Sequence, residues 1–232
     1  MNAHLRKDLE RLKAQIVREA IAVESNVRKS VKALRELSVK LAEDVVKSDY
    51  DIDKTEVDIE EECLKILALH QPVASDLRLV ITVLKINNEL EHIGDVAVNI
   101  AKRIPFMVSE EKSEVPFDFE TVTSRAVYML KCAIDSFLEE DEHLALGVCR
   151  DDEIIDNENR KCYGKVREIV DKTPHSAMLQ MNYLLISKSL ERIGDLCTNI
   201  AEDIIYMKRS IIVRHNLENA IREMKRADEE EE

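Results

Sequence analysis

The 232-residue sequence is poor in the residues that interrupt regular structure: it has 4 glycines, 4 prolines and no tryptophan. A chain of this length with so few breakers has room for few turns, so its regular elements must be long. Charged residues make up 35% of the chain, whereas aromatic residues make up only 4%. Long elements rich in Glu, Lys, Leu and Ala are helices, so the composition predicts an all-α fold.

The sequence also lacks long apolar runs and closely spaced cysteines. No apolar stretch approaches the roughly 20 residues that span a bilayer, and no charged-then-apolar signal segment opens the chain. Its 5 cysteines never form a Cys-x-x-Cys pair, which argues against a zinc framework or a disulfide scaffold. We therefore expect reduced thiols in helix cores, in a cytoplasmic protein that reaches a membrane only through a partner.

Basic charge is scarce as well. The chain has 34 Lys and Arg against 47 Asp and Glu, a formal net charge of −13. Binding to nucleic-acid phosphates requires a basic surface, so a nucleic-acid partner is not expected. The acidic balance instead suits cations or a basic face on another protein.

Apolar residues at alternating spacings of three and four predict an amphipathic helix over 5–34 and another over 119–137. Ser38 and Asp141 are N-cap candidates at the end of these stretches. We expect the first long helix of each unit to bend at these two positions.

Two prolines predict the later turns. Pro72 ends the helix before it, because the residue preceding a proline resists the helical region, and Pro174 marks a second turn. A third helix is expected from about Val73 to Phe106, and a last long helix from about Ala177 past Met207.

The same segment occurs twice. Leu90–Ala101 lies 100 residues before Leu190–Ala201, and 8 of the 12 positions are identical, including a glycine in mid-helix. A mid-helix glycine costs about 1 kcal/mol relative to alanine, so its presence in both copies supports a duplication. The sequence thus predicts two tandem, pseudo-symmetric three-helix bundles, 1–104 and 119–215, joined by a linker, 105–118, and followed by a charged tail, 216–232.

Carboxylates recur four residues apart, a spacing that places them on one helix face. In each unit the acids before the proline turn and those after it stand about the same number of residues from that turn. Antiparallel helices place such equidistant residues side by side. Each hairpin is therefore expected to bring four acids together: Asp49, Asp53, Glu91 and Asp95 in the first unit, and Asp152, Asp156, Glu191 and Asp195 in the second, with Asn99 and Asn199 as further oxygen ligands.

Acids in such contact either take up protons or hold a cation. Oxygen ligands favour hard or borderline ions such as Mg²⁺, Mn²⁺, Ca²⁺ or iron. A solvated acidic face is the alternative interpretation. Glu89 and His92 also have the Glu-x-x-His spacing of di-iron bundles, but the second copy has Ser189 and Arg192 there. A ferritin-like oxidase is therefore not expected, and His92 is interpreted as a surface residue.

Taken together, the motifs Gln71–Arg78, Leu90–Asp95 and Glu191–Asp195, with Asp49–Cys63, resemble the PhoU family of phosphate-transport regulators. The resemblance covers about 8–208. It implies two similar three-helix bundles that bind metal ions, singly or in multinuclear clusters of Mg, Mn, Fe or Zn, through the paired acidic motifs named above.

The resemblance also implies a role that is not enzymatic. PhoU proteins act at the inner membrane face with the ATPase subunit of the phosphate ABC transporter and with a phosphate-sensing histidine kinase. They restrain uptake and keep the phosphate-starvation genes off when phosphate is plentiful, and a homodimer is expected. A metal-dependent hydrolase and a purely structural helical scaffold remain as alternatives.

One motif is confined to the first unit. Ser75, Asp76 and Arg78 open the third helix, and nothing similar follows Pro174. Either Ser75 or Asp76 caps the helix while Arg78 forms a local ion pair, or Asp76 and Arg78 contact a partner.

Overall fold

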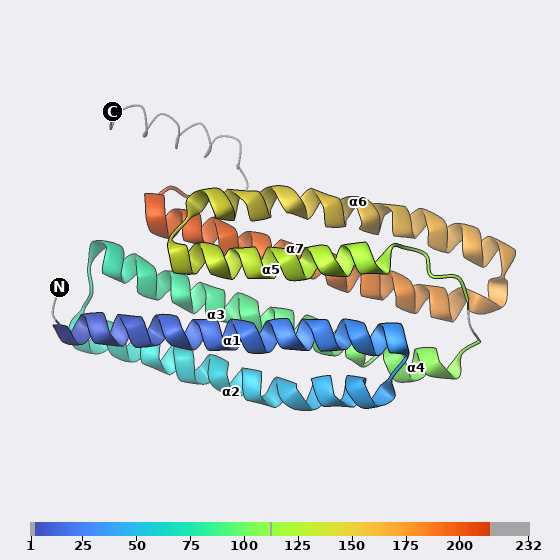
Figure 1. Ribbon diagram of the computed structural model, residues 1–232, viewed down its shortest axis with the longest axis horizontal. Coiled ribbons are helices and arrows are strands. Elements are labelled where there is room, and N and C mark those ends of the chain that lie inside the picture. The colour runs from blue at the N-terminus through green and yellow to red at the C-terminus, as the bar shows by residue number, and fades with distance from the viewer. Residues whose placement is uncertain (1–2, 112, 214–232) are drawn as a thin grey trace.

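The computed structural model describes residues 3–111 and 113–213, and within these ranges it is helical with no strand. The helices lie side by side along the long axis of the molecule (Figure 1). Their bounds are α1 Ala3–Glu36, α2 Val39–His70, α3 Ala74–Ala101, α4 Ile104–Ser109, α5 Phe119–Glu139, α6 Glu142–Lys172 and α7 Ala177–Arg209, with a 3₁₀ turn at Pro174–Ser176. The predicted all-α fold with a doubled three-helix unit is confirmed.

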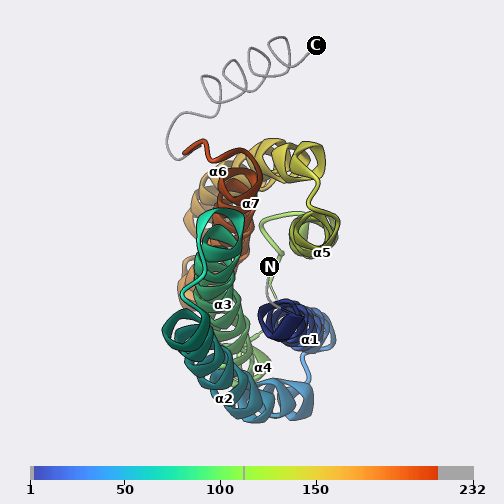
Figure 2. The ribbon, with the colours of Figure 1, turned by 90° about the vertical axis from the view of Figure 1, so that its left-hand side faces the viewer.

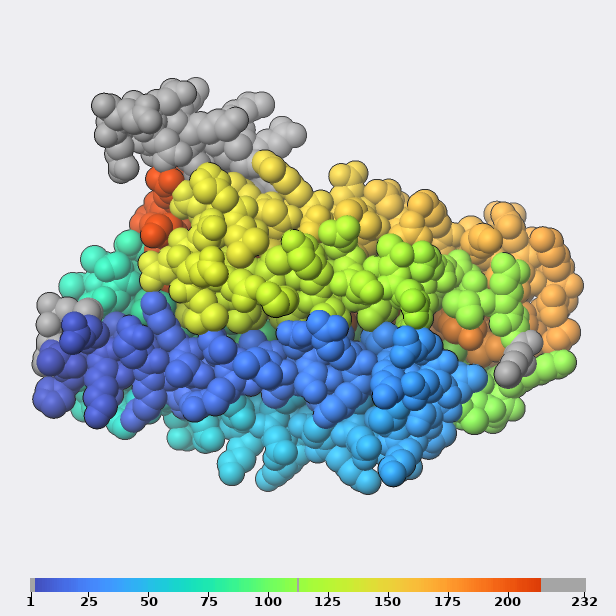
Figure 3. Space-filling view, in the orientation of Figure 1, coloured from blue at the N-terminus to red at the C-terminus, as the bar shows by residue number. Residues whose placement is uncertain are grey.

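The two repeats pack along α3 and α7, and α1 packs on α5. Viewed from the end, α2, α3, α7 and α6 form a curved layer, and α1 and α5 lie on its concave side (Figure 2). On the face shown in Figure 3, α1 and α5 meet along a continuous seam. A single apolar core runs through both repeats, with Leu90, Ile93, Leu190 and Ile193 fully buried at its centre. The pseudo-two-fold arrangement therefore lies within one continuous body.

The cap residues act as expected, but the predicted bends are wrong. Ser38 Oγ accepts a hydrogen bond from the Leu41 amide at 3.4 Å, and Asp141 Oδ1 accepts one from the His143 amide at 2.8 Å. The residues just before them, Leu37 and Glu140, have φ of 49° and 52°. A left-handed residue of this kind ends a helix, so the chain reverses direction instead of bending.

The third helix is shorter than expected. It ends at Ala101, and the short helix α4 begins three residues later with a proline in its first turn. Pro105 lacks an amide hydrogen and its ring clashes with the carbonyl four residues earlier, so α3 cannot run through it. The connecting segment after α4 is held against α7, because the Gln180 side chain donates to Ser113 Oγ at 3.1 Å and to the Glu114 carbonyl at 2.8 Å.

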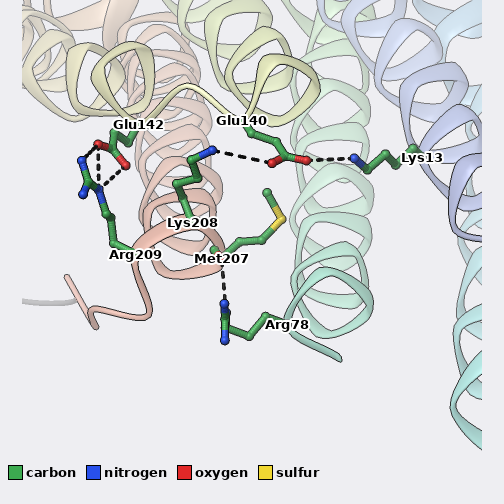
Figure 4. A network of polar contacts seen from close by, with 7 residues as sticks. All are labelled: Lys13, Arg78, Glu140, Glu142, Met207, Lys208 and Arg209. Carbon is green, nitrogen blue, oxygen red and sulfur yellow. Dashed lines mark hydrogen bonds and ion pairs between the residues drawn. The ribbon is translucent and has the colours of Figure 1, made fainter. Parts of the chain in front are cut away.

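A polar network joins the repeats at one end of the molecule (Figure 4). Arg78 Nε donates to the carbonyl of Met207, near the end of α7, at 3.2 Å. Glu140 lies between Lys13 and Lys208, with N–O distances of 3.1 and 3.8 Å. α3 is capped by Val73 without any side-chain hydrogen bond. The predicted cap by Ser75 or Asp76 and the local ion pair of Arg78 are therefore wrong; Arg78 instead ties the first repeat to the second.

We expect the substitution Arg78→Ala to destabilise the protein by about 1–2 kcal/mol, because it removes a charge-assisted hydrogen bond to the C-terminal end of α7. For a chain of this size that corresponds to a fall of roughly 2–8 °C in melting temperature. Arg6→Ala is the matched control, since the exposed Arg6 lines the same cavity of about 400 Å³. Equal melting temperatures for the two variants would show that the Arg78 bond adds nothing.

Candidate metal centre

The acidic rows lie where α2 faces α3 and where α6 faces α7. In each hairpin the buried positions repeat every seven residues, as at Ile52 and Ile59 on α2 and at Ile155 and Cys162 on α6. This repeat fixes which face of the helix enters the core. The carboxylates occupy the adjacent positions at the edge of the core, where all are half-buried except Asp53 and Asp95, which are exposed.

Two glycines allow the helices of each hairpin to approach closely. A Cβ on Gly194 would lie 2.5 Å from Asp152 Oδ1, and a Cβ on Gly94 would lie 3.4 Å from Asp49 Oδ1. At the first distance a Cβ would force the Asp152 carboxylate to move, whereas the second distance is an ordinary van der Waals contact. Gly194 is therefore the closer approach of the two, and the position of Gly94 has room for a Cβ.

The carboxylates of the first repeat influence one another. Burial, followed by the charges of Asp53 and Asp95, raises the pKa of Asp49 to about 6. Burial and then the charge of Asp95 also raise the pKa of Glu91, and His92 partly offsets that rise. Like charges at close range disfavour ionisation, so this site favours bound protons or a cation.

The second repeat shows the same effect more strongly. Burial, followed by Asp195, Asp156 and Glu191, raises the pKa of Asp152 to about 7. Burial and then Glu191 raise the pKa of Asp195. Within the described residues, Asp152 Oδ1 and Glu191 Oε2 are buried without a hydrogen-bond partner. Buried, unpaired carboxylate oxygens are costly, and a bound cation would satisfy them.

Basic neighbours distinguish the two sites. In the second repeat, Lys188 pairs with Glu191, Arg192 lies 3.8 Å from Asp195 and Arg160 lies 3.9 Å from Asp156. In the first repeat the exposed His92 lies 3.7 Å from Glu91. The second site thus carries more positive charge of its own, and His92 is the surface residue it was predicted to be.

The carboxylates are near one another but do not form a finished coordination shell. Among the described residues, no group of three or more His, Cys, Asp or Glu side chains is arranged to hold a metal ion. The unpaired oxygens of Asp152 and Glu191 nevertheless fit a cation, which the carboxylates would reach by side-chain rotation.

Of the other predicted residues, Asn199, Asp76 and Arg78 lie elsewhere. Asn199 directs its amide to Glu89 across the interface of α3 and α7, at 3.4 Å, and not into its own acidic row. Asn99 is exposed on α3. Asp76 and Arg78 line the cavity at the end of the molecule and take no part in the acidic rows.

Glu19 on α1 is a buried acid that was not among the predicted site residues. This residue is 1% exposed, and neither of its carboxylate oxygens has a hydrogen-bond partner within the described part of the chain. Burial, followed by the charges of Glu56 and Glu91, raises its pKa to about 8. Its position could have been found, because Glu19 falls within the apolar stripe between Ile16 and Val23.

This architecture, a doubled three-helix unit with an acidic row in each copy, is that of a known class of proteins. The chain matches the PhoU domain twice, over residues 16–104 and 121–204. The chain belongs to the PhoU family.

Among its relatives is the phosphate-specific transport system accessory protein PhoU homolog 1 of Thermotoga maritima, 32% identical over 89% of this chain and 90% of that protein. The phosphate-specific transport system accessory protein PhoU homolog of Pseudomonas aeruginosa is 35% identical over 90% of this chain and 86% of that protein. The crystal structure of PhoU from Pseudomonas aeruginosa superposes with a TM-score of 0.84 at 34% identity, covering 89% of this chain and 99% of that one.

Within residues 3–111 and 113–213, no helix is both long and apolar enough to cross a membrane.

The raised pKa values predict how stability depends on pH when chelator keeps the sites free of metal. The pKa of Asp152 is about 7 in the folded chain and about 3.9 when unfolded. The folded state therefore binds more protons between these values, and the free energy of unfolding falls as pH rises from about 4 to 7.

We expect Asp152→Asn to flatten this decline, so that the variant gains stability over wild type as pH rises across that range. Chemical denaturation in chelator at a series of pH values measures the difference. Asp58→Asn, at an exposed position on α2, is the charge-matched control. A difference between wild type and Asp152→Asn that stays constant with pH would contradict the assignment.

Proposed function

We propose that the chain is a metal-binding regulator of phosphate uptake and phosphate-starvation signalling. The observation that carries the metal-binding part is the pair of acidic hairpins, with buried and unpaired carboxylate oxygens on Asp152 and Glu191. Membership of the PhoU family supports the regulatory part, because its relatives are named accessory proteins of the phosphate-specific transport system. The same names favour a regulator over the metal-dependent hydrolase.

In this proposal each repeat holds its own cations. Asp49, Asp53, Glu91 and Asp95 would hold those of the first repeat, and Asp152, Asp156, Glu191 and Asp195 those of the second. A cation bound there would supply positive charge that cancels the repulsion among the acids. Carboxylate oxygens suit Mg²⁺, Mn²⁺ or iron best, whereas zinc sites more often include nitrogen or sulfur ligands.

The proposed partners are the ATPase subunit of the phosphate transporter and a phosphate-sensing histidine kinase, met at the cytoplasmic face of the membrane. The formal charge of −13 favours partners that present basic surfaces. A homodimer belongs to the same proposal.

We expect Glu91→Gln with Asp95→Asn to remove about half of the bound metal and half of the stability lost on adding chelator, because the second repeat keeps its own site. Metal that binds only the folded state adds roughly 3 kcal/mol when its concentration is 100 times its dissociation constant. Metal analysis and melting temperatures, with and without chelator, measure both quantities.

Glu191→Gln with Asp195→Asn should give the mirror-image result. Asp51→Asn with Asp58→Asn, two exposed positions on α2, removes the same charge outside the rows and should change neither quantity. If the row variants keep the metal content and chelator response of wild type, the acids are solvated surface and the metal-binding part fails.

The regulatory part has its own test. In a strain lacking this chain, phosphate-starvation genes should be expressed in phosphate-rich medium, and a plasmid copy of the wild type should switch them off again. The purified chain should also bind the purified ATPase subunit of the phosphate transporter but not that of an unrelated ABC transporter. Unchanged expression in the deletion strain would contradict the proposed role.

A further inference from the structure

α2 carries a second apolar stripe on the side facing away from the core. Tyr50, Val57 and Leu64 follow one another at seven-residue intervals and are 73%, 49% and 54% exposed. The core residues Ile52 and Ile59 lie two positions after the first two of them. Two residues correspond to about 200° around a helix, so this stripe and the core face lie on opposite sides of α2.

Within residues 3–111 and 113–213, no other element covers the stripe. α2 makes its main contacts with α1, α3 and α4, and it lies at one edge of the curved layer (Figure 2). Single exposed apolar residues are ordinary, but a row of large ones along one helix face marks an interaction surface.

The second repeat shows that the fold itself does not require the stripe. Each position of α2 corresponds to the position of α6 that lies 103 residues later. Ile52 thus corresponds to Ile155, and both are buried. The stripe positions in α6 are charged instead: Glu153, Arg160 and Arg167, all exposed. Since the same helix in the same place folds with charges there, the fold itself does not account for the apolar residues of α2.

The charge around the stripe indicates what that contact is. α2 is acidic as a whole, with ten Asp and Glu against four Lys between Val39 and His70, a net charge of −6. The exposed acids beside the stripe that take no part in the metal rows are Asp51, Asp58, Glu60 and Glu61. A second copy of this chain would bring the same charge to the contact and be repelled. A helix with apolar residues every seven positions, flanked by Lys and Arg, would bury the stripe and pair with the acids.

We propose that the stripe formed by Tyr50, Val57 and Leu64 docks a basic amphipathic helix of a partner protein, in the first repeat only. The proposal rests on the proposed function in one respect, since a regulator must contact another protein. It adds the surface used and the chemistry of the segment recognised.

The test uses a synthetic, fluorescently labelled helical peptide of about three heptads, with leucine every seven residues and flanking lysines and arginines. Its affinity for the full chain is measured by fluorescence anisotropy at about 0.15 M salt, where long-range attraction is screened. A peptide of identical composition with scrambled leucines separates docking from charge attraction.

Val57→Ser with Leu64→Ser removes the apolar contact, and Val57→Arg with Leu64→Arg installs the residues that α6 carries at these positions. Both variants should bind the peptide at least about tenfold more weakly than wild type, as expected when buried apolar side chains are lost. Ile21→Ser, at a 63% exposed position on α1, is the control and should bind like wild type. Circular dichroism confirms that each variant is folded.

The proposal would be overturned if wild type and the Val57 and Leu64 variants bound the peptide with equal affinity. It would also be overturned if wild type bound the scrambled peptide as tightly as the heptad peptide. If the chain dimerises and both variants abolish the dimer, the proposal is also overturned, because the stripe would then bind a second copy of the chain. Metal content and starvation-gene repression are measured independently, so failure of the peptide test is distinguishable from failure of the proposed function.

Discussion

The close approach of paired helices at two glycines is the constraint on which the rest of the molecule depends. At Gly194 the missing Cβ lets Asp152 on α6 lie directly against α7, and at Gly94 Asp49 on α2 lies at van der Waals distance from where a Cβ would be. The same approach partly removes the carboxylates from water and raises the pKa of Asp152 to about 7. Packing that serves the core thus leaves negative charge at its edge, where protons or cations must compensate for it.

The two repeats meet this constraint differently. The second surrounds its acids with basic side chains, Lys188 and Arg192 among them. The first adds a further buried acid, Glu19. In the register shifted by 103 residues the equivalent position of α5 is Val122, which is also buried, so the second repeat has an apolar side chain where the first has Glu19. Duplication preserved the hairpins, while the residues around them diverged.

Local patterns in the sequence were sufficient to predict the helices, the caps at Ser38 and Asp141 and the pairing of the acidic rows, because each depends on spacing along one helix or across one turn. The failures required longer-range information. A cap residue marks where a helix begins, but it does not say whether the chain reverses, as it does at Leu37. Asn199 and Arg78 find partners in the other repeat, at Glu89 and Met207, and no periodicity indicates such contacts. Glu19 was not predicted to be buried, because a single acid within an apolar stripe was interpreted as a break in the pattern.

Anomalous X-ray diffraction from crystals grown with Mn²⁺ tests the central claim most directly, because it locates the ion without reference to activity. The account predicts one peak or cluster between α2 and α3, near Asp49 and Glu91, and another between α6 and α7, near Asp152 and Glu191. Two acidic hairpins without anomalous density at a Mn²⁺ concentration that saturates the protein would contradict it.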